Sequence, residues 1–69
     1  MGLNMKLYNS RNKEYITILG DPTEEVFFFD HLDGMYSYCK NKSGGIVHLS
    51  VVTNVKVVDK PEDWDEGQN

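Results

Sequence analysis

The chain has 69 residues, which is enough for one domain and too few for two hydrophobic cores. Seven basic and eleven acidic residues give a net charge of −4, which opposes non-specific attraction to a nucleic-acid backbone. Cys39 is the only cysteine, so an intramolecular disulfide and a cysteine-rich zinc site are excluded. We see no signal peptide and no run of the ~20 apolar residues that a membrane span needs. We therefore expect a soluble cytoplasmic protein that does not contact membranes.

The first third of the chain predicts a β-hairpin or one long, kinked strand. Residues 5–8 alternate weakly between apolar and polar side chains, and residues 9–12 supply turn chemistry. A second strand follows at 14–19, and the sequence Gly-Asp-Pro-Thr at 20–23 ends it, because proline has no ladder donor and glycine tolerates turn angles.

The segment 26–39, VFFFDHLDGMYSYC, is the most informative part of the sequence. It predicts a β-hairpin, with one strand from 26 to 30 or 31, a turn at 32–34 and a return strand at 35–40. Successive strand residues point to opposite faces, so Phe27 and Phe29 share one face and Phe28 lies on the other. One face therefore carries apolar side chains outward, and a one-residue change of register decides which.

The remaining body of the chain continues the pattern of short strands. Residues 41–45, NKSGG, predict a loop, 46–49 a strand, 50–54 an ambiguous segment, and 55–58 a last strand. No segment has the period of an amphipathic helix. Five or six short antiparallel strands bury their edges best by closing into a small barrel, so we predict an all-β domain over 1–58. We predict that residues 59–69 form a flexible acidic tail.

This order of elements resembles SH3-like small barrels of the KOW and Tudor kind. The resemblance rests on Lys13, Tyr15 and the Leu19-Gly20 pair, on the Asp-Gly hairpin at 32–34, and on His48-Leu49 followed by a short turn before the last strand. It implies a fold and not an activity. The composition also resembles the small early proteins of T4-type bacteriophages, which implies a factor that binds and modulates a host enzyme.

We predict a non-enzymatic protein-binding module without cofactor or metal. Outward aromatic side chains with an acidic rim favour a protein partner with a basic surface, and an exposed ring patch also suits a homodimer. In the tail, a tryptophan among carboxylates suits a segment that orders on a partner, or one that covers the open end of the barrel. The predicted partner-binding residues are Phe27, Phe29, Tyr36, Tyr38, Glu62, Asp63, Trp64, Asp65 and Glu66.

Several alternatives use the same residues. A KOW-like accessory would bind nucleic acid, or a complex that contains it, through stacked rings, although acids outnumber bases around these rings. A Tudor-like cage would bind a methylated cation through some of Tyr15, Phe29, Tyr36, Tyr38 and Trp64. Cys39, His48 and Asp30 would form a nucleophilic site, and His31, Asp33 and His48 a metal site, if the strands bring them together.

Overall fold

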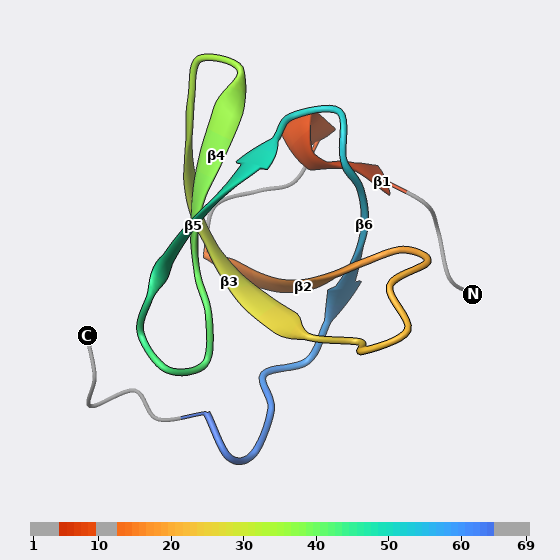
Figure 1. Cartoon of the computed structure of the whole chain (residues 1–69), viewed down its shortest axis with the longest axis vertical. Coiled ribbons are helices and arrows are strands. Elements are labelled where there is room, and N and C mark those ends of the chain that lie inside the picture. Colours follow the sequence, from red (N-terminus) through yellow and green to blue (C-terminus); the bar gives the residue numbers. More distant parts are fainter. Residues whose placement is uncertain (1–4, 10–12, 65–69) are drawn as a thin grey trace.

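The computed structural model describes residues 5–9 and 13–64. These residues form one antiparallel sheet with the strand order β1-β6-β2-β3-β4-β5 (Figure 1). The elements are β1 (Met5–Lys6), the 3₁₀ turn η1 (Leu7–Asn9), β2 (Glu14–Ile18), β3 (Val26–Asp33), β4 (Tyr36–Lys40), β5 (Ile46–Ser50) and β6 (Asn54–Val58). Within this part of the chain, no helix is long and apolar enough to cross a membrane.

The sheet curls into a small barrel because the segment around η1 links its two ends. The backbone N–H of Leu7 donates to the carbonyl of Thr53 (2.8 Å), and that of Tyr8 donates to Val51 (3.1 Å). The N–H of Val51 in turn donates to the carbonyl of Met35 at the tip of the β3–β4 hairpin (3.0 Å). Strands β2 to β5 form a meander and β6 returns to pair with β2, so the predicted all-β antiparallel fold is confirmed, and its strand order is compatible with an SH3-like barrel.

The prediction for the N-terminal third is wrong, because the strand expected at 5–8 ends at Lys6, Leu7–Asn9 form η1, and β1 pairs with β6 and not with β2. From β2 onward, turn positions follow the sequence closely, with one difference. The segment between β5 and β6 is a single turn in which the N–H of Thr53 donates to Ser50 (3.0 Å), as the resemblance implied. The β3–β4 turn, however, is centred on Gly34 and Met35 rather than on 32–34. Strand β3 is longer than predicted because residues 32 and 33 still pair with β4. Gly34 has φ +65°, a left-handed conformation that glycine adopts without strain.

The core lies on the concave face of the sheet and is small. Six hydrophobic side chains are buried in it, namely Leu7, Ile16, Phe27, Phe29, Cys39 and Val55. Ser37 is the buried polar residue in the described part of the chain, and its hydroxyl donates to the carbonyl of Leu49 (3.2 Å). A satisfied hydroxyl is tolerated in a core, whereas an unpaired one costs free energy.

Phe27 and Phe29 are therefore core residues and not outward ones. Phe27 is 5% exposed and Phe29 is fully buried. The prediction that these two side chains form part of a surface contact is therefore wrong. Phe28, on the opposite face, is the half-buried outer ring of this run. The predicted alternation is confirmed. The sequence left open which face is buried, and in the structure it is the face of Phe27 and Phe29, because their rings fill the space between β2, β4 and η1.

A β-bulge at Asp30 changes which side chains lie on which face. Phe29 pairs with Cys39, but the next paired residue is His31, opposite Tyr38. A bulge inserts one unpaired residue and shifts the alternation beyond it. His31 and Asp33 would share the inner face with Phe29 in a regular strand, but the shift places them on the outer face. Asp33 then lies opposite Tyr36.

Candidate functional site

The outer face of the sheet carries two aromatic groups, and the first is covered by the end of the chain. Tyr15 and Phe28 are cross-strand partners with ring centroids 5.0 Å apart. The Trp64 ring meets Tyr15 edge-on at 5.2 Å. The ammonium of Lys13 lies 5.9 Å from the Phe28 ring centroid, within the range of a cation–π contact. This aromatic group is half-buried, so it leaves little ring surface for a partner.

The segment after β6 folds back onto the barrel. The N–H of Trp64 donates to the carbonyl of Pro61 (3.2 Å), which forms a turn. Asp63 forms an ion pair with Lys42 in the β4–β5 loop, and the hydrogen bond from Lys42 lowers the pKa of Asp63. Trp64 thus covers part of the outer face and not an open end. Glu62 is exposed, and Asp65 and Glu66 lie outside the described residues.

The second aromatic group surrounds Tyr38. His31 of β3 stacks on the Tyr38 ring with centroids 4.8 Å apart and an angle of 8° between the planes. His48 of β5 meets the same ring at 4.4 Å and 75°. The Tyr38 ring is therefore fixed from both neighbouring strands, and the bulge at Asp30 makes this possible because it turns His31 outward.

Asp30 anchors this group at its edge. Its carboxylate accepts a hydrogen bond from Lys13 Nζ (2.7 Å), and its other oxygen lies 2.5 Å from His31 Nδ1. The hydrogen bond from Lys13, followed by the one from His31, lowers the pKa of Asp30. The Asp30 contact holds the His31 ring in the orientation that stacks on Tyr38.

A shallow hollow of about 210 Å³ lies beside this group, at the β3–β4 hairpin end of the outer face. Two cross-strand pairs supply its lining, which consists of Asp33, Tyr36, Tyr38 and His48. The Tyr36 side chain is 56% exposed. Asp33 has no ion-pair partner among residues 5–9 and 13–64, whereas Asp30 and Asp63 are both paired. The hollow thus combines exposed ring surface with an uncompensated carboxylate.

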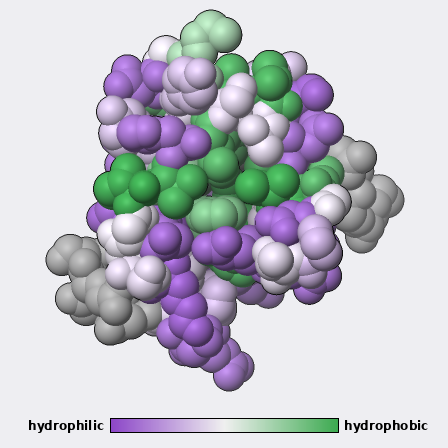
Figure 2. Space-filling view, viewed as in Figure 1, coloured by the Kyte–Doolittle hydropathy of each residue, from purple (hydrophilic) through white to green (hydrophobic). Residues whose placement is uncertain are grey.

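Exposed apolar side chains concentrate at the same end of the barrel. Seven large hydrophobic residues in the described segments are exposed, and five of them lie on the hairpin tip, on η1 or on the turn after β5: Tyr8, Leu32, Met35, Tyr36 and Val52. The backbone bonds of Val51 to Met35 and Tyr8 bring these three segments together. Figure 2 shows hydrophobic side chains at the upper edge of the molecule, where Figure 1 places the hairpin tip, and in a band across its middle. We call these five residues the hairpin-end patch.

The predicted tyrosines, Tyr36 and Tyr38, therefore lie together on the outer face, but without the predicted phenylalanines. Sequence reasoning gave His31 and His48 no role beside Tyr38. It also missed four residues of the hairpin-end patch as contact candidates: Tyr8, Leu32, Met35 and Val52. The Asp-Gly turn followed by Met-Tyr could have predicted Met35 at an exposed hairpin tip. The pairing of His48 with Tyr38 depends on the β4–β5 register, which cannot be read from the sequence.

The structure separates the residues of the alternative sites. Cys39 is fully buried on the inner face, where burial raises the pKa of its thiol, while His48 lies on the outer face. Cys39 and His48 therefore do not form the nucleophilic pair that we considered. Phe29 is in the core and Tyr15 contacts Trp64, so the five rings considered for a cage do not gather. In the described part of the chain, no three His, Cys, Asp or Glu side chains are grouped as metal ligands.

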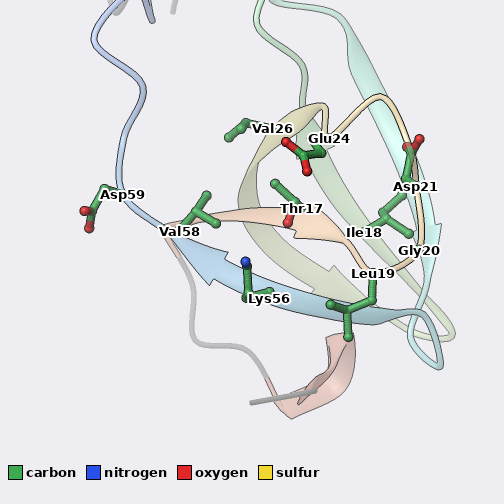
Figure 3. A pocket seen from close by; sticks show the side chains of 10 residues that line it. All are labelled: Thr17, Ile18, Leu19, Gly20, Asp21, Glu24, Val26, Lys56, Val58 and Asp59. Atoms are coloured by element: carbon green, nitrogen blue, oxygen red, sulfur yellow. The ribbon is translucent and has the colours of Figure 1, made fainter. Parts of the chain in front are cut away.

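A second hollow, of about 340 Å³, lies between the β2–β3 loop and β6. Figure 3 shows Thr17 and Lys56 on neighbouring strands, beneath the loop that carries Asp21 and Glu24. Aliphatic side chains complete the lining. Three carboxylates and one ammonium are spread around a mainly aliphatic floor, an arrangement with no convergent set of donors or acceptors.

No protein-family model matches the chain, and neither the curated proteins nor the solved structures contain a protein that matches it.

Proposed function

We propose that this chain is a non-enzymatic protein-binding module that contacts its partner through the hairpin-end patch and the adjoining hollow. The supporting observation is the concentration of five of the seven exposed large hydrophobic residues at one end of the barrel. Exposed apolar side chains that gather at one end of a small domain are typical of a contact surface. Tyrosine and methionine are also enriched at the centre of protein interfaces.

Charge sets the kind of partner. The chain has a net charge of −4, and Asp33 at the border of the patch has no ion-pair partner in the described residues. An apolar patch beside unpaired negative charge favours a partner with a basic rim, because complementary potentials speed association and disfavour wrong partners. A second copy of this chain would meet like charge, so a homodimer is the less favoured partner.

The composition extends this proposal to a phage-encoded modulator of a host enzyme. That part rests on the resemblance to small early phage proteins and on the size of the domain, which leaves room for a contact surface and little else. It predicts that the partner is one bacterial enzyme whose activity changes on binding.

Affinity capture from nuclease-treated bacterial lysate tests the proposal. The bait is the full chain, compared with a Met35→Ser, Val52→Ser double variant and with Ile46→Ser. Ile46 is a matched control because it is as exposed as Tyr36 but lies at the opposite end of β5. We expect one stoichiometric protein that the double variant loses and the control keeps. Equal capture by both variants would place the contact elsewhere.

Two further arms test the role of the tail and the runner-up function. A chain ending at Lys60, and charge reversal at Asp63 and Asp65, should slow association with a basic partner if the tail steers it. If the tail acts only by covering Tyr15, the reversals will leave association at low salt unchanged. Capture that disappears once nucleic acid is digested would favour a KOW-like accessory over a protein-binding module.

A further inference from the structure

We propose that the hollow lined by Asp33, Tyr36, Tyr38 and His48 binds an arginine side chain of the partner. This inference rests on the proposed protein-binding function and names the side-chain chemistry that the contact recognises.

The charge in the hollow is uncompensated. In the described residues, Asp30 is paired with Lys13 and Asp63 with Lys42, but Asp33 has no cationic partner. Its side chain is exposed and its position is fixed, because it pairs with Tyr36 at the last rung of the hairpin before the turn. A cation that reaches this carboxylate gains an ion pair without displacing one already made.

Ring surface next to that carboxylate selects the kind of cation. Tyr36 is 56% exposed, and Tyr38 and His48 complete the lining. A guanidinium is planar, stacks on aromatic rings and presents a fork of donors that matches a carboxylate. An ammonium is more strongly hydrated and binds as a point charge. A hollow of about 210 Å³ has room for the tip of one side chain.

The Tyr38 side of the hollow is also preorganised. His31 and His48 hold Tyr38 from both sides, and Asp30 holds His31. Fixed side chains lose little conformational freedom on binding, so more of the interaction energy contributes to affinity. The bulge at Asp30 is the structural cause, because it turns both His31 and Asp33 to the outer face.

A nuclear magnetic resonance titration tests the inference on the full chain without any partner. The probes are acetyl-Gly-Arg-Gly-amide and the same peptide with citrulline, which keeps the shape of arginine and removes its charge, and with lysine. We expect amide shifts at residues 33–38 and 48 with the arginine peptide, and an affinity at least fivefold lower for citrulline and about threefold lower for lysine. Equal shifts with citrulline, shifts elsewhere or no shifts would overturn the inference.

Two variants and a control locate the site. Asp33→Asn should weaken the arginine peptide threefold to tenfold, and Tyr36→Leu, which keeps an apolar side chain without the ring, should weaken it by a similar factor. Glu25→Gln removes one negative charge from the exposed β2–β3 loop and should change the affinity less than twofold. Equal weakening by Glu25→Gln would mean attraction to net charge and not to this hollow.

The inference and the proposed function fail in different ways. If the captured partner binds Asp33→Asn as tightly as the parent chain, the arginine site is wrong and the protein-binding function stands. If the arginine peptide binds in the hollow but no protein is captured, the hollow recognises arginine and the proposed protein-binding function is wrong.

Discussion

Replacing Phe29 and Phe28 in turn tests the assignment of faces, on which the whole outer surface depends. The two residues are neighbours with the same side chain, yet Phe29 is fully buried and Phe28 is half-buried on the outer face. Phe29→Ala removes a whole phenyl ring from a core of six hydrophobic residues. Such a change costs about 3–5 kcal/mol, from lost transfer free energy and from the cavity that remains.

Phe28→Ala should cost much less. The position is open to solvent on one side, so water fills the space and no cavity term arises, and we expect about 1–2 kcal/mol from the apolar area that Tyr15 and Lys13 share with the ring. The difference between the two variants is therefore about 2–3 kcal/mol. A domain this small has a total stability of only a few kcal/mol, so Phe29→Ala is expected to be largely unfolded at 25 °C.

Urea denaturation followed by circular dichroism measures both values. If Phe29→Ala has no folded baseline, the milder variant Phe29→Leu replaces it in the comparison. Phe29→Leu should lower the urea midpoint without abolishing folding. Phe28→Leu is its matched control. A larger loss of stability from the Phe28 variants than from the Phe29 variants would mean that the inner and outer faces are assigned the wrong way round. The hairpin-end patch and the arginine hollow would then both be wrong.

Three further predictions concern single residues. The pKa of Asp30 is lowered, first by the hydrogen bond from Lys13, so its ionised form stabilises the fold above the ordinary value near 3.8 and this contribution is lost as the pH falls through the lower, folded-state value. The difference in urea midpoint between the parent chain and Asp30→Asn should therefore shrink as the pH is lowered from 6 to 2. Because Cys39 is fully buried and burial raises the pKa of its thiol, the thiol should react with iodoacetamide much more slowly in the native protein than in urea. Native labelling as fast as labelling in urea would contradict its place in the core. Gly34→Ala should lower stability by about 1 kcal/mol through strain alone, since no atom lies within 4 Å of the added Cβ, and Gly34→Asn should cost less, both measured as midpoint shifts.

Local chemistry in the sequence was sufficient for the strands from β2 onward and for their order along the chain, but not for η1. Alternation of apolar and polar residues set the strands, Gly20 with Pro22 ended β2, and Asp33-Gly34 marked the hairpin. These signals are local, because strand period and turn conformation depend on residues only a few positions apart. The opposite facing of Phe28 and Phe29 follows from the same period.

Only the tertiary structure decided which face of each strand became the core and what covered the other. The bulge at Asp30 moved His31 and Asp33 outward, and the ion pair of Lys42 with Asp63 accompanies the placement of Trp64 on Tyr15. Both outcomes depend on contacts between residues far apart in the chain, such as Lys13 with Asp30. A sequence pattern fixes the period of a strand, but the face that it buries is chosen by whichever neighbouring strands fill the space more completely.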